Sequence, residues 1–300
     1  MKLYAPRYYK KFKCIADKCE HSCCIGWEID IDKTTLEKYK KLKGGYGDII
    51  AGTVSFQDLP HFKLDNGERC PHLDPCGLCK IIINFGQEYL CDICREHPRF
   101  YNYTSVVEVG LGLSCEEAAR IILSSSDYDT FECIGDVDLE EDIVDFDGAL
   151  ERGEIYKILR QAKDYKTRLK EIYSKYQVDA GKDEKWLKIL ASLEYLDQNH
   201  KGLFENYSSQ KRPDDKICEE YLERFLAYLI YRHTTEASDY EDFLLRLSFC
   251  LFCERLLSSL ICFKGARELS EVVTLARIIS EEIEYSEDNT EALIYQKVTY

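Results

Sequence analysis

Apolar side chains recur at helical spacing through the second half of the chain. Residues 155 to 176 predict one long amphipathic helix whose stripe is Ile155, Leu159, Ala162, Tyr165, Leu169, Ile172 and Tyr176. Two further helices are predicted by the stripes Ile217, Tyr221, Phe225, Tyr228 and Leu269, Val272, Ala276, Ile279, Ile283. Residues 243–263 are apolar on nearly every face, so we expect them to form the central buried helix of a bundle.

The first 115 residues have a different pattern, with short segments separated by glycine and proline. Trp27–Ile31 alternates apolar and acidic residues and predicts a strand, and Thr34–Leu42 predicts a short helix. Ser114 followed three residues later by Glu117 forms a capping-box pattern before an apolar run, which predicts that a helix begins there.

These patterns together predict a mainly α protein with two parts. Residues 1–135 form a cysteine-rich, metal-binding region of short irregular elements. Residues 151–300 form an all-α helical bundle. The acidic stretch 136–150 connects them, because its carboxylates repel one another and its apolar residues are few.

The composition of the chain indicates that its cysteines have a chemical role and are not needed as disulfide bonds for stability. The chain has 300 residues, of which 45% are hydrophobic, so it can build a core without disulfide bonds. Its basic and aromatic start, MKLYAPRYYKKFKC, does not resemble a secretory signal, and no stretch suits a membrane span. We therefore expect a cytoplasmic protein with reduced thiols, in which the 15 cysteines serve metal binding.

Charge is unevenly distributed along the chain. Residues 1–120 hold 17 basic and 17 acidic residues, so residues 121–300 carry the whole net charge of −15. Such an acidic half argues against nucleic acid as a partner and favours a basic or neutral one, although most of these carboxylates are expected simply to solvate the surface.

Ten cysteines lie in two groups between residues 14 and 115. The first is Cys14, Cys19, Cys23 and Cys24; the second is Cys70, Cys76, Cys79, Cys91, Cys94 and Cys115. Clustered thiolates select zinc, copper(I) or iron–sulfur clusters, and the two C-x2-C pairs of the second group suit a tetrahedral zinc. The alternative is that they are small buried hydrophobes, which is the interpretation we favour for Cys250 and Cys253 in the apolar helix.

Histidines His21, His72 and His97 lie among these cysteines. Each is either a metal ligand or a hydrogen-bonding neighbour of the site, and the sequence leaves both roles open.

The segments YAPRYYKKFKCIADKCEHSCCIGWEIDID, RCPHLD, GLCKI, LCDICREHPRFYN and LSCEEAARIIL together resemble the flagellin lysine N-methylase family. The resemblance covers about residues 4 to 123. It implies an enzyme that transfers methyl groups from S-adenosylmethionine to lysines of flagellin and carries a [4Fe-4S] cluster. The family pattern maps onto Cys14, Cys19, Cys23, Cys24, Cys70, Cys79, Cys94 and Cys115, whereas Cys76, Cys91 and His97 depart from it.

The residues themselves contain neither standard site for this cofactor. No glycine-rich turn follows a strand of an α/β unit, and Gly110 and Gly112 lack the third glycine. The C-x3-C-x2-C loop of radical enzymes is also missing its third cysteine, because Gly26 stands there. We leave the catalytic and cofactor-binding residues unassigned.

Methyl transfer to lysine needs a deprotonated amine, because the ammonium form has no free electron pair. Glu28, Asp30 and Asp32 are candidate bases by position, but a plain solvent-facing strand edge also explains their alternation and is the interpretation we favour. Arg95 and Arg99 are candidates for holding a cofactor carboxylate or for pairing with nearby acids.

Two other functions fit the same residues. The chain is also compatible with a zinc- or iron-binding protein without enzymatic activity that grips a partner as a chaperone does, and with an iron–sulfur redox sensor. The sequence leaves the oligomeric state open.

Overall fold

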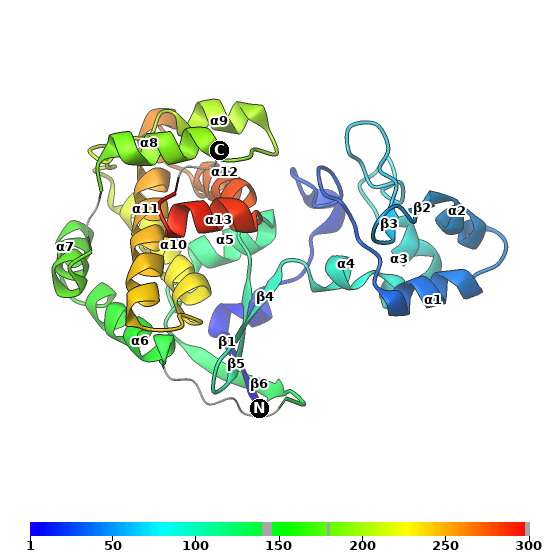
Figure 1. Ribbon diagram of the computed structural model, residues 1–300, viewed down its shortest axis with the longest axis horizontal. Coiled ribbons are helices and arrows are strands. Elements are labelled where there is room, and N and C mark those ends of the chain that lie inside the picture. Colours follow the sequence, from blue (N-terminus) through cyan, green and yellow to red (C-terminus); the bar gives the residue numbers. More distant parts are fainter. Residues whose placement is uncertain (140–145, 179–180, 298–300) are drawn as a thin grey trace. The chain divides into compact units, whose positions relative to one another are not determined.

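The computed structural model describes residues 1–139, 146–178 and 181–297, which divide into two compact units (Figure 1). Unit 1 combines Met1–Phe12 with Arg99–Tyr300, and unit 2 is Lys13–Pro98. Unit 2 is therefore an insertion in the chain of unit 1. These boundaries differ from the expected division at 136–150, of which residues 140–145 lie outside the described part.

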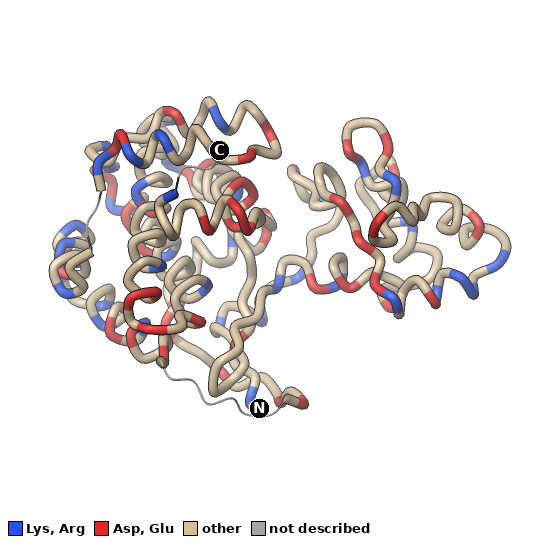
Figure 2. Tube along the Cα trace, viewed as in Figure 1, with Lys and Arg blue, Asp and Glu red and all other residues tan. Residues whose placement is uncertain are grey.

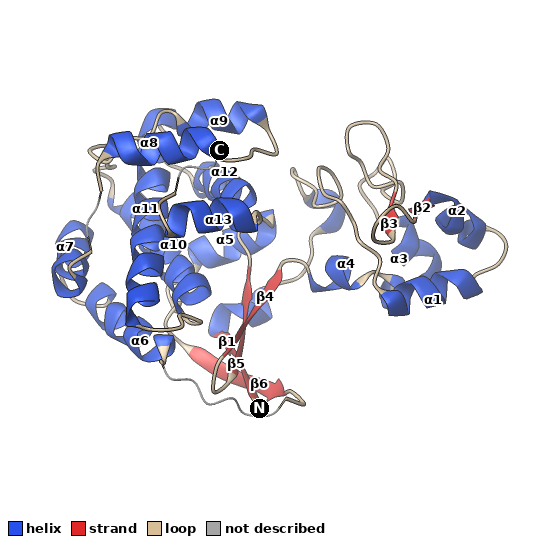
Figure 3. Cartoon of the chain, in the orientation of Figure 1, coloured by secondary structure: helices blue, strands red, loops and turns tan. Residues whose placement is uncertain are grey.

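Unit 1 contains a four-stranded sheet that the helical pattern did not predict. Its strands, in the order β4-β5-β1-β6, are β4 (Arg99–Tyr103), β5 (Val107–Leu111), β1 (Lys2–Pro6) and β6 (Phe131–Asp136). Strand β1 runs parallel to β5, with Leu3 opposite Val107, and antiparallel to β6. The mainly α class is confirmed (Figure 3): every strand of the described residues lies before residue 137, and the described part of 151–300 is helical with connecting loops, as predicted.

Helices make up the rest of unit 1. They are α5 (Glu116–Ser124), α6 (Gly148–Leu159), α7 (Tyr165–Tyr176), α8 (Asp183–Ser192), α9 (Gln198–Phe204), α10 (Lys216–Thr234), α11 (Tyr240–Lys264), α12 (Leu269–Ile279) and α13 (Glu287–Ile294), with the 3-10 helix η1 (Arg7–Lys11) after β1 and the π-helix η4 (Ser280–Glu284) after α12. Helix α11 is the buried central helix predicted for 243–263, and Cys250 and Cys253 are fully buried in it.

The long helix predicted over 155–176 is wrong, because the chain breaks between α6 and α7. The Asp164 carboxylate accepts a 2.9 Å hydrogen bond from the backbone N–H of Thr167 and so begins a new helix. Ala162, assigned to the stripe, lies exposed in the break. The apolar positions on either side, Ile155 and Ile172, are buried as expected.

Two local predictions also need correction. Helix α5 begins where expected, but Cys115 is its N-cap residue, and the buried Ser114 hydroxyl finds no hydrogen-bond partner among the described residues. Glu117 pairs with Arg120 at 2.6 Å instead of closing a capping box. On α10, Ile217 is 54% exposed, so that stripe begins one turn later.

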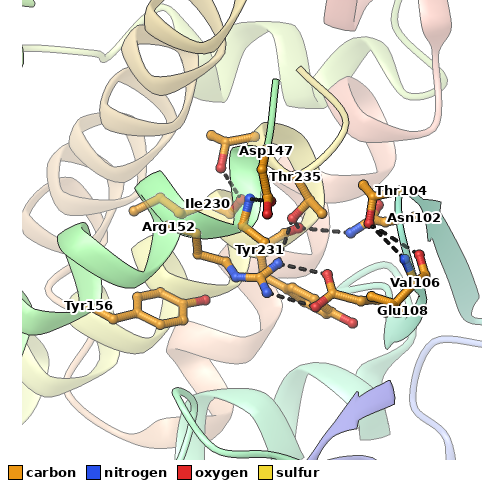
Figure 4. A network of polar contacts seen from close by, with 12 residues as sticks. Asn102, Thr104, Val106, Glu108, Asp147, Arg152, Tyr156, Ile230, Tyr231 and Thr235 are labelled. Carbon is orange, nitrogen blue, oxygen red and sulfur yellow. Dashed lines mark hydrogen bonds and ion pairs between the residues drawn. The ribbon is translucent and has the colours of Figure 1, made fainter. Parts of the chain in front are cut away.

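A buried ion pair joins the sheet to the helices of unit 1 (Figure 4). The Arg152 guanidinium on α6 donates two 2.7 Å hydrogen bonds to the Glu108 carboxylate on β5 and one of 2.7 Å to the Thr235 hydroxyl. Phe131 and Tyr231 lie against the guanidinium, with ring centroids 4.7 and 5.1 Å from its carbon. Neither charged side chain is more than 7% exposed.

The packing of α6 on the end of α10 depends on a glycine. A Cβ atom on Gly148 would lie 2.2 Å from the Thr234 carbonyl oxygen and 2.7 Å from that of Thr235. Only glycine allows the two backbones to approach this closely.

The π-helix η4 brings buried carboxylates into the helical core. Glu284 accepts hydrogen bonds from His233 Nε2 at 2.7 Å and from the Tyr228 hydroxyl at 3.0 Å, and Arg232 lies 3.5 Å away. Burial alone would raise the pKa of Glu284, but the positive charge of Arg232 and the His233 contact outweigh it and lower the pKa to about 2.

Unit 2 has short elements around a small core of its own. They are η2 (Ala16–Lys18), α1 (Lys33–Lys41), α2 (Tyr46–Thr53), the hairpin strands β2 (Val54–Ser55) and β3 (His61–Phe62), α3 (Lys80–Phe85), η3 (Gln87–Tyr89) and α4 (Asp92–Glu96). Helix α1 confirms the prediction for Thr34–Leu42 to within one residue. Trp27–Ile31 forms only an isolated bridge, Asp30 to His61, and not a strand, although Ile29 and Ile31 are buried and Glu28 and Asp30 are exposed.

A membrane-spanning helix needs both sufficient length and an apolar sequence. Within 1–139, 146–178 and 181–297, no helix is long and apolar enough. Helix α11, with 25 residues, is long enough to span a membrane, but it contains the charged residues Arg246, Glu254 and Arg255.

Candidate thiol site

Five cysteines contribute to the core of unit 2. Cys70 and Cys91 are buried in it, and Cys24, Cys79 and Cys94 pack against it. They come from four places in the chain, so the fold of this unit gathers thiols that are up to 70 residues apart in sequence. We call these five residues the thiol core.

Backbone contacts hold three of these cysteines in register. The Cys70 N–H donates a 2.8 Å hydrogen bond to the Cys24 carbonyl oxygen, and Leu73 bridges Cys79. Asp74 makes the turn between them, because its carboxylate accepts 2.8 Å hydrogen bonds from the N–H groups of Cys76 and Leu78. The sequence PHLDPCGLCK is therefore a tight turn that places Cys70 and Cys79 on adjacent segments.

The other two thiols lie on α4. Cys91 is its N-cap residue and Cys94 follows one turn later, so the two side chains share one face of the helix. The Tyr39 hydroxyl lies 3.7 Å from the Cys91 sulfur. A hydrogen bond from the Cys94 thiol lowers the pKa of Cys91 against the opposing effect of burial. The same hydrogen bond raises the pKa of Cys94, and burial raises it further.

The remaining thiols of the core differ in their readiness to ionise. Hydrogen bonds from Cys23 and Ser22, with the charge of Arg69, lower the pKa of Cys24 to about 7. Burial raises the pKa of Cys70 to about 12 and also raises that of Cys79. Metal binds the thiolate form of cysteine. Because their pKa values are lowered, Cys24 and Cys91 are the thiols of the core that ionise most readily.

The sequence-predicted ligands fall into three groups. Cys24, Cys70, Cys79 and Cys94 belong to the thiol core. Cys14, Cys19 and Cys23 lie on the loop before it, where Cys14 and Cys23 are exposed. Cys115 belongs to unit 1 as the N-cap residue of α5.

Cys91 departs from the family pattern, and the structure buries it in the core of unit 2 with only 1% exposure. The signal was present in the sequence, because Cys91 and Cys94 are one helical turn apart. Cys76, which also departs from the family pattern, is exposed.

The described residues do not form a ready-made metal cage. Within them, no three His, Cys, Asp or Glu side chains are grouped closely enough to hold a metal ion. His72 is buried with Nδ1 2.8 Å from the Tyr46 hydroxyl and Nε2 3.0 Å from the Thr53 hydroxyl. Both nitrogens are thus engaged, and His72 is a hydrogen-bonding neighbour of the thiol core.

The three candidate bases lie in surroundings that suit structural or surface roles. Asp32 caps α1: its carboxylate accepts hydrogen bonds from the N–H groups of Thr35 at 2.8 Å and Asp92 at 2.9 Å. These bonds outweigh partial burial and lower the pKa of Asp32, which makes it a poor proton acceptor. Glu28 and Asp30 face solvent, as a plain surface edge would.

The two candidate arginines belong to different units. Arg95 pairs with Asp92 and Glu96 on α4. Arg99 begins β4, donates a 2.8 Å hydrogen bond to the Tyr9 hydroxyl and lies over the rings of Tyr9 and Phe12.

Figure 2 shows that acidic residues are spread over the helices and loops of unit 1, as a solvated surface requires.

Three known proteins resemble this chain. The lysine-N-methylases of Salmonella typhimurium and Salmonella choleraesuis are each 31% identical over 134 residues, which is 41% of this chain and 32% of theirs. The flagellar biosynthetic protein FliU of Salmonella muenchen is also 31% identical over 134 residues, and the match covers 77% of it. The match thus spans about a third of the longer relatives. No family model and no solved structure matches the chain.

Proposed function

The chain belongs to the flagellin lysine-N-methylase family, and from this premise we propose that it transfers methyl groups from S-adenosylmethionine to lysine side chains of flagellin. We further propose that unit 2 carries an iron–sulfur cluster on its cysteines. The observation that supports the second proposal is the gathering of five thiols around one small core.

The donor set suits such a cluster in its chemistry. Soft sulfur ligands select iron–sulfur centres, zinc or copper(I) over hard cations. Among the described residues, no three potential ligands are close enough together to hold a metal ion. The support for the cluster is therefore that the five cysteines share one hydrophobic core. Cys24, Cys70, Cys79 and Cys94 would hold the cluster, with Cys91 as an adjacent fifth thiol. When bound, a cluster supplies a redox-active or Lewis-acidic iron centre.

The protein's own residues organise this site in two ways. The Asp74 turn and the Cys24–Cys70 backbone bond fix the spacing of three thiols. Tyr39 and His72 cover the core from within unit 2, and each has its polar atoms satisfied by neighbouring groups, so neither competes as a ligand.

The experiment that tests this proposal starts with purification under anaerobic conditions. Iron, sulfide and zinc are measured together with the visible spectrum, for the natural protein and for Cys70→Ser, Cys94→Ser and the control Cys133→Ser. Cys133 is exposed on β6 of unit 1. We expect iron and sulfide in cluster proportions, lost in the first two variants and kept in the control. Zinc alone in a colourless protein would refute the cluster.

Methyl transfer is assayed separately, with flagellin and S-adenosylmethionine labelled in its methyl group. We expect label on flagellin lysines and S-adenosylhomocysteine formed only when flagellin is present. A protein that is fully loaded with metal and transfers no label would refute the enzymatic proposal and leave the metal site standing.

A further inference from the structure

A pocket of about 190 Å³ opens in unit 1 where the first turn of α7 meets the first turns of α10. Tyr165, Leu222 and Pro213 form its apolar walls, and all three side chains are buried. The pocket lies outside the thiol core, and no step proposed so far uses it.

A buried ion pair between Arg212 and Glu254 supports one side of the pocket. Arg212 donates 2.9 Å hydrogen bonds from both terminal nitrogens to the two carboxylate oxygens of Glu254, a residue with no exposed surface. The Tyr165 hydroxyl donates a third bond, of 3.1 Å, to Glu254. The pair uses two of the five N–H groups of a guanidinium, so Arg212 keeps donors for a ligand.

Three charged side chains at the rim form no ion pair with any other described residue. Lys166 provides a positive charge, and Asp214 and Glu219 provide negative charges, all lining the same pocket. Within the described residues none of the three takes part in an ion pair, whereas the neighbouring Arg224 and Glu220 pair at 3.0 Å. The positive charge comes from α7, and the negative charges come from α10 and the residue pair before it, so the pocket is lined by opposite charges from different elements.

This arrangement matches one class of ligand. A carboxylate alone would be repelled by Asp214 and Glu219, and an amine alone by Lys166. A zwitterion satisfies both sides, because its carboxylate accepts from Lys166 and Arg212 while its ammonium group donates to Glu219 and Asp214. The apolar walls then suit a short aliphatic or thioether chain.

We propose that this pocket binds the α-amino-acid group of a small zwitterionic ligand. We identify that group as the methionine end of S-adenosylmethionine, and this assignment rests on the proposed function. The pocket would thus supply the cofactor site that the sequence lacks in either of its standard forms.

The test is calorimetric titration of the full chain with two probes, S-adenosylhomocysteine and free methionine. The variants Lys166→Met and Glu219→Gln each remove one charge from the rim. Lys170→Met on α7 and Glu241→Gln on α11 are the matched controls, since both are exposed helix residues outside the pocket. Circular dichroism melts establish that all four variants fold.

We expect each rim variant to weaken S-adenosylhomocysteine binding about tenfold, as the loss of one charge-assisted hydrogen bond implies, and each control to leave it unchanged. Binding that the rim variants do not weaken overturns the pocket and leaves the methylase proposal intact. Methionine binding that the rim variants weaken, with no binding of S-adenosylhomocysteine, supports the zwitterion site and refutes the cofactor. Binding of neither probe overturns the inference.

Discussion

The buried Arg152–Glu108 pair allows a quantitative prediction about unit 1 (Figure 4). Replacing Arg152 by methionine keeps much of the aliphatic length of the side chain and removes the charge. The Glu108 carboxylate would then lose both of its 2.7 Å hydrogen bonds to the guanidinium. It is only 4% exposed, so water cannot readily replace them.

The expected cost follows from that geometry. Removing one partner of a buried pair leaves an uncompensated charge and costs about 3–5 kcal/mol. The Phe131 and Tyr231 rings also lose their cation contact, which places Arg152→Met toward the upper end of that range. Replacing both residues by methionine removes the stranded charge, so the double variant should lose less than about 2 kcal/mol.

Urea unfolding followed by tryptophan fluorescence measures these costs in unit 1. The chain has two tryptophans, Trp27 in unit 2 and the fully buried Trp186 in unit 1. All variants are therefore made in a Trp27→Phe background, so that Trp186 alone reports. Lys157→Met on the same helix is the control, because its pair with Glu154 is exposed and is worth less than about 1 kcal/mol.

Two results would refute the reasoning. One is a cost below about 1 kcal/mol for Arg152→Met, which would mean that the pair is not desolvated. The other is a double variant whose cost equals the sum of the two single variants, since independent contributions exclude a coupled pair.

Three further predictions concern unit 1. Asp164→Ala should cost about 1 kcal/mol by removing the cap of α7, and Asp164→Ser should restore most of it in the same urea assay. Gly148→Ala should lower the thermal midpoint more than Gly153→Ala on the same helix, because a Cβ on Gly153 meets nothing within 4 Å. The pKa of Glu284, about 2 against an ordinary 4.5, gives stability that is complete above pH 4.5 and is lost as the pH falls toward 2, by about 3 kcal/mol. Glu284→Gln should flatten that part of the curve of unfolding free energy against pH; an unchanged slope would assign it to other groups.

Helices that are apolar on nearly every face, or whose apolar residues recur at helical spacing, could be predicted from the sequence, because burial alone selects them. Helix α11 is the clearest case, and α12 and the end of α10 follow the same rule. The break before α7 could have been predicted from Asp164, whose capping preference competes with a stripe that continues across it. Hydrophobic periodicity does not register such a competition.

The sheet of unit 1 could not be predicted in this way, since its pairing is non-local. Strand β1 is a five-residue segment whose partner Val107 is more than 100 residues away, and nothing in KLYAP specifies that partner. For the candidate site, spacing identified the cysteine-rich region, but only the folded chain distinguishes the thiol core from the exposed loop cysteines. The pocket between α7 and α10 likewise joins segments that no motif connects.

The insertion of unit 2 between β1 and β4 sets an order of events during translation. Strand β1 is made before β5, and Leu3 pairs with Val107, which is made about 100 residues later. At about 5–20 residues per second, that delay is about 5–20 s. Unit 2, which ends at Pro98, is synthesised within this time and is complete before Val107 is made, while β1 still lacks its β5 partner. The nascent chain therefore holds an unpaired strand beside a folding cysteine-rich unit, and early binding of metal to that unit would shorten the exposure of its thiols.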